Sequence, residues 1–159
     1  MAGQPITVID VLPRIDQFST IGPLAAATAG DGPLSFPQVP RSNGISAFID
    51  QISYSINTRA SDAAANFRIL RVPFAAGGYA NVAAMVSAGL PVTTAGATPA
   101  TGALGAATGT LETGRVYDVT VLTDQNEIEP GDILLLDTSG TLTNLAGLVV
   151  TIRYSTRRK

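Results

Sequence analysis

The chain has 159 residues and a formal net charge of −2, and it contains neither histidine nor cysteine. This length suits one domain whose core needs no disulfide or metal. The missing residue types exclude a serine–histidine triad, a zinc site or a thiol enzyme in its usual form, and the charge argues against nucleic acid as the main partner. We therefore expect a protein that is not an enzyme, with no catalytic residue, metal or cofactor.

The first 44 residues are predicted to form an extended N-terminal arm. They hold six of the ten prolines, which fix φ and disfavour long helices and central strands. The aliphatic content exceeds what a disordered tail needs, so we expect the arm to dock on a partner; the alternative is an irregular segment packed on its own domain. The candidate partner-binding residues of the arm are Ile6, Val8, Val11, Leu12, Ile15 and Phe18. No secretion signal is visible at Met1–Pro5, which predicts synthesis in a cytoplasm, where the protein stays or joins something assembled there.

A β domain is predicted over residues 45–159, beginning with two strands. Apolar residues alternate from Ile45, and the alternation changes parity between Ile49 and Ile52, which indicates a strand with a bulge. A second strand is predicted over 67–74, with Phe67 and Ile69 on one side and Leu70, Val72 and Phe74 on the other. Residues 81–88 are consistent with a short helix stopped by Gly89.

The middle of the chain carries no charge at all between Val72 and Leu111, and residues 87–110 consist mostly of Ala, Thr and Gly. Two prolines and five glycines in 87–110 argue against a membrane helix. We interpret this stretch as a long surface loop, either built to lie against another protein or free and flexible.

The last third shows the clearest strand pattern. Strands are predicted within 116–123, 133–136 and 148–154, with turns at 129–132 and 137–140. The apolar run 133–136 is typical of a strand buried on both faces. Strands punctuated by such turns predict an all-β fold, namely an antiparallel β-sandwich, jelly-roll-like, or a barrel.

Charged groups are sparse. The densest acidic group is a solvated turn or, alternatively, a cation site; it comprises Asp124, Glu127, Glu129 and Asp132. Three arginines, Arg68, Arg71 and Arg115, suggest a positive strip or rim positions that pair across subunits. The basic end of the chain is either a solubilising tail or a contact for an acidic partner surface or nucleic acid; it comprises Arg157, Arg158 and Lys159.

The layout of the whole chain resembles the capsid decoration, or cement, proteins of tailed bacteriophages. The resemblance rests on the Pro-rich apolar arm, the low-charge Ala/Thr/Gly middle and a β domain containing Glu-Pro-Gly-Asp-Ile-Leu-Leu-Leu-Asp at 129–137. It implies a homotrimer that binds the major capsid protein and stabilises the outer surface of the virion, without membrane contact. Other classes stay open: a phage tail, baseplate or shell subunit, and a carbohydrate-binding β-sandwich.

Overall fold

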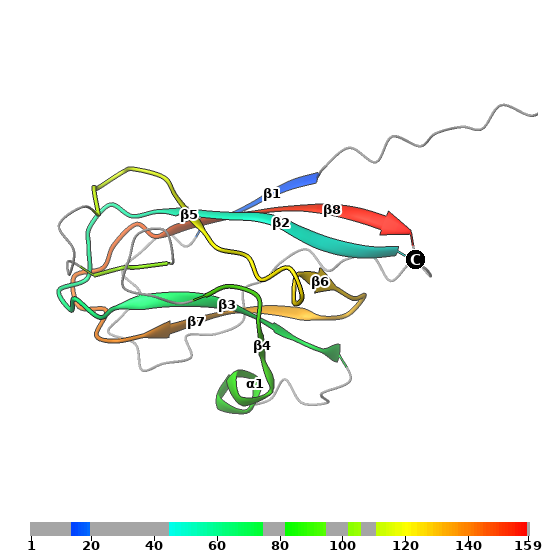
Figure 1. Ribbon diagram of the computed structural model, residues 1–159. Helices are drawn as coiled ribbons and strands as arrows, with labels where there is room; N and C mark the ends of the chain where they lie inside the picture. The colour runs from blue at the N-terminus through cyan, green and yellow to red at the C-terminus, as the bar shows by residue number, and fades with distance from the viewer. Residues whose placement is uncertain (1–13, 20–44, 75–81, 95–101, 106–110, 159) are drawn as a thin grey trace, which may run out of the picture.

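The regular secondary structure of the described residues is almost entirely β-strand, arranged in two antiparallel sheets, with one short helix (Figure 1). The computed structural model describes residues 14–19, 45–74, 82–94, 102–105 and 111–158. The predicted all-β class is confirmed. The elements are β1 (Arg14–Ser19), β2 (Ile45–Ser55), β3 (Asn66–Val72), α1 (Val82–Ala88), β4 (Leu90–Pro91), β5 (Tyr117–Val119), β6 (Glu127–Ile128), β7 (Ile133–Ser139) and β8 (Val149–Arg158).

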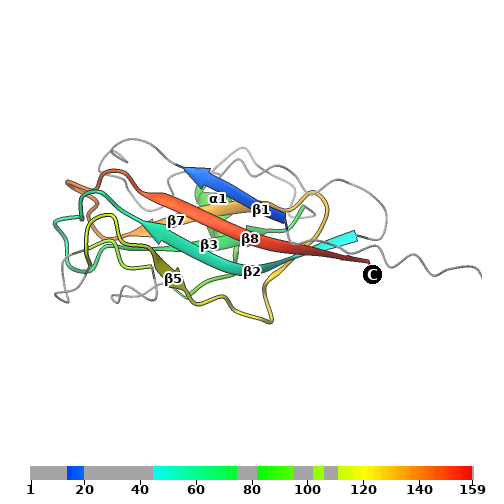
Figure 2. The same ribbon diagram turned by 90° about the horizontal axis from the view of Figure 1, so that it is seen from above.

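The larger sheet has the strand order β1-β8-β2-β5 (Figure 2). The short strand β6 pairs with the other end of β2. Its centre is the long antiparallel pair of β2 and β8, which runs from Ile45 opposite Arg158 to Ser55 opposite Val149. Alternation along β8 turns Val150 and Ile152 into the core and leaves Arg153 exposed. The sheet therefore has one apolar face and one polar face.

The bulge predicted in the first strand of the domain is confirmed. The register of β2 against β8 shifts between Ile49 and Gln51, so Asp50 is the extra residue on β2. Ile49 and Ile52, on the two sides of this shift, are both fully buried. The bulge keeps both apolar half-strands facing the core, which a regular period of two would not do.

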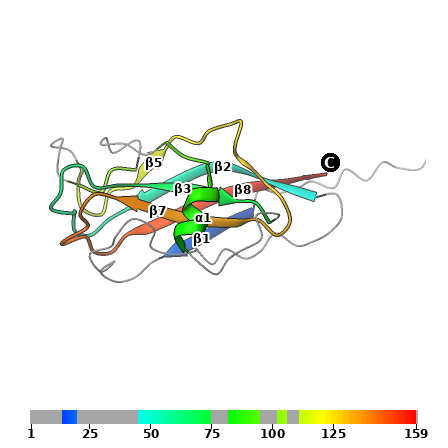
Figure 3. The same ribbon diagram turned by 90° about the horizontal axis from the view of Figure 1, so that it is seen from below.

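The smaller sheet has the order β4-β3-β7, and both faces of its central strand are apolar. Phe67 and Ile69 join the main core between the sheets, whereas Leu70 and Val72 face a second cluster with Met85 of α1. This division matches the sequence-based prediction for the strand. Figure 3 shows α1 lying across the outer side of this sheet.

The strand predicted at 133–136 is confirmed, because Leu134, Leu135 and Leu136 are all buried. The turn predicted at 137–140 is wrong. Asp137, Thr138 and Ser139 continue β7 in register with β3, and Asp137 accepts a hydrogen bond from Arg68 at 2.6 Å. A strand-breaking aspartate is kept in the strand by this tertiary partner, and the strand ends only before Gly140.

The turn predicted at 129–132 is confirmed. The Asp132 amide donates to the Glu129 carbonyl at 3.0 Å, and Gly131 adopts a φ of 97° at the third position of the turn. A positive φ at this position is the reason why glycine follows proline here.

The interpretation of residues 87–110 as surface is wrong for two parts of the stretch. Val92 and Thr93 are buried, and the Thr93 hydroxyl accepts a hydrogen bond from the Ile69 amide at 2.7 Å. Residues 102–105 are also buried and pair with backbone on both sides, including the Phe67 amide, which donates to the Gly102 carbonyl at 2.9 Å. These segments lack charge because they belong to the chain's own core. Residues 95–101 and 106–110 lie outside the described residues.

The Tyr54 hydroxyl joins the larger sheet to the buried residues 102–105, which we call the inserted segment. It donates a buried hydrogen bond to the Ala103 carbonyl at 2.7 Å, and its ring meets the Phe67 ring edge-on at 5.0 Å. Burial, together with the neighbouring Tyr117 hydroxyl, raises the pKa of Tyr54, so the hydroxyl stays protonated and remains a donor.

We expect Tyr54→Phe to lower the free energy of unfolding by about 1–2 kcal/mol, because the buried Ala103 carbonyl loses this donor. Urea unfolding followed by far-UV circular dichroism measures the change. Tyr117→Phe is the matched control, because the Tyr117 hydroxyl accepts an exposed bond from the Glu112 amide and its loss should cost only about 0.5 kcal/mol. Equal losses for the two variants would contradict this role for Tyr54.

Asp62 joins the connection before β3 to the connection after β7. Its carboxylate accepts hydrogen bonds from the Ala64 amide at 2.9 Å and from the Thr141 amide at 2.8 Å. The backbone bond from Thr141, followed by that from Ala64, lowers the pKa of Asp62 below its usual value.

The lowered pKa of Asp62 gives its contribution to stability a pH dependence. A carboxyl group whose pKa is lower in the folded state stabilises the fold above its unfolded pKa of about 3.9, and this stabilisation is lost as the pH falls through the folded value. We expect Asp62→Asn to be less stable than the parent at pH 7 and the gap between their urea midpoints to shrink below about pH 4. A gap that stayed constant down to pH 2 would contradict this assignment.

Candidate partner-binding surface

The edge of the larger sheet carries two of the predicted arm residues. Ile15 and Phe18 lie in β1, where they stand opposite Arg153 and Val150 of β8. The backbone of β1, residues 14–19, thus pairs with the chain's own domain. Four other predicted arm residues lie outside the described residues: Ile6, Val8, Val11 and Leu12.

The basic end of the chain lies on the same strand. Arg157 and Arg158 extend β8 and stand opposite Ser46 and Ile45 of β2, while Lys159 lies outside the described residues. Because β1 runs antiparallel to β8, its first residue, Arg14, lies opposite Tyr154, close to this end of β8. The described members of the predicted arm and basic groups therefore lie on neighbouring strands.

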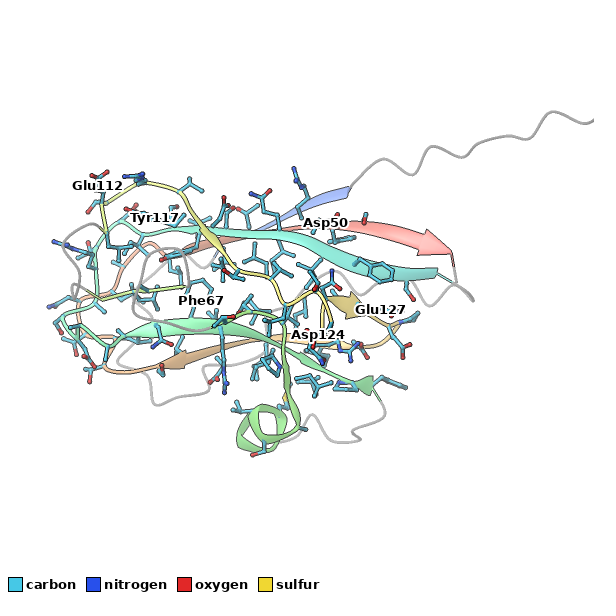
Figure 4. The ribbon with its side chains drawn as sticks, viewed as in Figure 1. Asp50, Phe67, Glu112, Tyr117, Asp124 and Glu127 are labelled. Atoms are coloured by element: carbon cyan, nitrogen blue, oxygen red, sulfur yellow. The ribbon has the colours of Figure 1, made fainter. Side chains whose placement is uncertain are left out.

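The outer face of the larger sheet is polar around the bulge. The Gln51 amide donates to the Asp118 carboxylate at 2.9 Å, and the Ser155 hydroxyl donates to the Asp50 carboxylate at 3.2 Å. Figure 4 shows Asp50 on the side of this sheet that faces away from the smaller sheet. Both carboxylates are exposed, and neither forms an ion pair with another described residue.

A shallow pocket of about 440 Å³ opens where the bulge interrupts the pairing of β2 between β5 and β6. Two hydrogen bonds between Ile49 and Asn126 close one side: the Ile49 amide donates at 2.9 Å, and the Asn126 side chain returns a bond at 3.0 Å. Its lining is Ile49, Asp50, Gln51, Asp118, Val119, Val121, Thr123 and Asn126. The carboxylates of Asp50 and Asp118 in this lining accept hydrogen bonds, so the pocket favours a bound group that donates them. The broken alternation at Asp50 signals the bulge in the sequence, but nothing local predicts that Asp118 and Asn126 lie beside it.

The acidic turn has a structural role. The Asp132 carboxylate accepts hydrogen bonds from the Phe74 amide at 3.0 Å and the Glu129 amide at 2.9 Å, and it lies 3.8 Å from Arg71. Within the described ranges, no group of three acidic, histidine or cysteine residues is placed to hold a metal ion.

The predicted strip of arginines is wrong as a single surface, because the three side chains bind separate partners inside the chain. Arg68 and Arg71 lie on opposite faces of β3, the first paired with Asp137 and the second donating to the Glu127 carbonyl. Arg115 pairs with Glu112 at 3.4 Å in the loop before β5.

The described part of the chain contains no helix that is long and apolar enough to cross a membrane. No protein-family model, curated protein or solved structure matches the chain.

Proposed function

We propose that this protein is a non-enzymatic structural subunit that binds other proteins through its N-terminal arm and the adjoining end of the larger sheet. The observation that carries the proposal is β1: a segment of the arm supplies an edge strand whose only partner among the described residues is β8. An arm that supplies an edge strand uses backbone hydrogen bonds for binding, as proteins do when a strand is added to a neighbouring sheet.

The fold proposed for this subunit is a β-sandwich. Its support is the main core, to which the larger sheet contributes Ile52 and Ile152 and the smaller sheet contributes Phe67 and Leu136. In this arrangement the outer faces of both sheets, their edges and the arm are the surfaces left for contacts with other subunits.

The specific role we propose is that of a homotrimeric decoration protein, which binds the major capsid protein and stabilises the outer surface of a bacteriophage capsid. This step rests on the resemblance in sequence layout. A closed symmetric oligomer suits the role, because several weak arm contacts made together raise the total affinity by avidity.

Co-sedimentation with undecorated capsids of tailed bacteriophages tests the proposal. Removal of residues 1–13 leaves β1 in place and is expected to weaken capsid binding at least tenfold, a loss of about 1.4 kcal/mol or more. Joint Arg157→Glu and Arg158→Glu substitution should also weaken it. Arg115→Glu is the control, because this exposed charge lies in the loop before β5, away from β1 and the end of β8. Unchanged binding by the chain that lacks residues 1–13 would contradict the role of the arm.

A further inference from the structure

We propose that β1 is exchanged between copies of this chain, so that β1 of one copy pairs with β8 of the next. The proposal rests on the oligomer proposed above and names the partner of the arm as a second copy. The sheet edge in question is the one formed by β8, which β1 covers from Ser19 opposite Val149 to Arg14 opposite Tyr154.

The topology of the larger sheet makes such an exchange possible. β1 and β2 lie on opposite sides of β8, and both are antiparallel to it, so β1 and β2 run parallel to each other. The chain therefore leaves β1 at Ser19, beside Val149, and enters β2 at Ile45, beside Arg158. Between these two points it must cover the length of β8, ten residues or about 33 Å.

The connection between the two strands is much longer than this path. Residues 20–44 number 25, and an extended chain of that length spans up to about 85 Å. Four of the 25 are proline, a residue that favours extended backbone. The connection has enough length to bring β1 back to its own β8 or to place it on the β8 of a neighbouring copy.

The two arrangements contain the same strand pairing. The register and backbone hydrogen bonds between β1 and β8 do not depend on whether both strands belong to one chain, so exchange sacrifices no pairing. A connection of 25 residues gives β1 an effective concentration of about millimolar at the β8 of its own chain. Within an oligomer, the β8 edge of a neighbouring copy is present at a comparable local concentration. The exchanged pairing therefore competes with pairing inside one chain.

Exchange of this kind also has the symmetry that a ring requires. Each copy donates one strand and accepts one, which is a head-to-tail contact. Such contacts close into a ring when the rotations from copy to copy add up to one full turn. Three copies would form a closed ring in which every β8 edge is covered. The same strand would then hold the trimer together.

The absence of cysteine allows a direct test by disulfide trapping. Gln17 of β1 and Thr151 of β8 are register partners, and cross-strand partners lie within the Cα separation that a disulfide spans. Two chains of different tag length, one carrying Gln17→Cys and the other Thr151→Cys, are expressed together, purified and oxidised. We expect the mixed dimer to be the main cross-linked product. Random collision would give the mixed dimer only half of the product, and a share at or below half would overturn the proposal.

Two further variants make the result decisive. The double variant Gln17→Cys/Thr151→Cys should form a disulfide quantitatively, within one chain or between chains; if it forms none, the β1–β8 pairing itself is absent and the proposal falls. Ser53→Cys replaces Thr151→Cys as the matched control, since Ser53 lies opposite Thr151 on β2, one strand farther from β1. It should give no excess of mixed dimer. A mixed-dimer share at or below half, found together with full capsid binding in the co-sedimentation assay, would overturn this inference and leave the proposed function standing.

Discussion

Phe67→Ala is expected to lower the free energy of unfolding by about 3–5 kcal/mol, the usual cost of removing a fully buried aromatic side chain. Phe67 has no exposed surface and lies between the two sheets (Figure 4). Its ring packs edge-on against the ring of Tyr54. Its backbone also pairs with Gly102, so the cavity would open where the two sheets and the inserted segment 102–105 meet. The total free energy of unfolding of such a domain is about 5–15 kcal/mol, so the variant should lose a large share of its stability.

Thermal and urea unfolding of Phe67→Ala measure this loss. For a domain of this length, 3–5 kcal/mol corresponds to a decrease in Tm of roughly 6–20 °C. Phe74→Ala is the matched control: the same side chain is removed, but Phe74 is 48% exposed, and the cost should stay below about 1.5 kcal/mol. Similar losses for the two variants would contradict the placement of Phe67 at the centre of the core.

Gly105→Ala is expected to lower the free energy of unfolding by about 3 kcal/mol or more, although it adds a single methyl group. A Cβ at this position would stand 1.9 Å from the Asp62 carbonyl oxygen and 3.0 Å from the Ala63 carbonyl carbon. Both are backbone atoms, so relief requires the chain itself to move. That movement would disturb the hydrogen bond from the Gly105 amide to the Ala65 carbonyl and the bridge to Ala60. Overpacking that forces side-chain and backbone shifts typically costs about 1–3 kcal/mol, and a clash this close with backbone atoms places Gly105→Ala at or above the upper end of that range.

Gly114→Ala separates this clash from the general cost of replacing glycine. Nothing lies within 4 Å of a Cβ at Gly114, but its φ of 75° is unfavourable for alanine and should cost about 1–2 kcal/mol. Urea midpoints of the two variants give the comparison. A smaller loss for Gly105→Ala than for Gly114→Ala would show that segment 102–105 is not inserted against the Asp62 backbone.

The local elements of the fold were predictable because their signals are local. The parity change near Asp50 predicted the bulge, the two sides of β3 were read from the order of Phe67 to Val72, and the Pro-Gly pair predicted the turn before β7. Each of these depends on residues within a few positions of one another. Alternation of apolar residues and the choice of turn residues predict structure reliably over such short stretches of sequence.

The failed predictions concern residues whose partners lie far away in the sequence. Asp137 looks like the start of a turn until Arg68, on the neighbouring strand, is placed beside it. A stretch without charge is equally consistent with an interface and with burial in its own domain, and only the bridges of Asn66 to Ala103 and Ala60 to Gly105 decide between them. Sheet order likewise brings Asp118 and Asn126 to the bulge, and sheet order does not follow from local pattern.

The solution mass of the full chain, measured by light scattering behind size-exclusion chromatography, tests the central claim of an oligomeric structural subunit most directly. The account predicts a single species with three times the mass of one chain, stable across a wide range of protein concentration. A species with the mass of one chain at every concentration would contradict it.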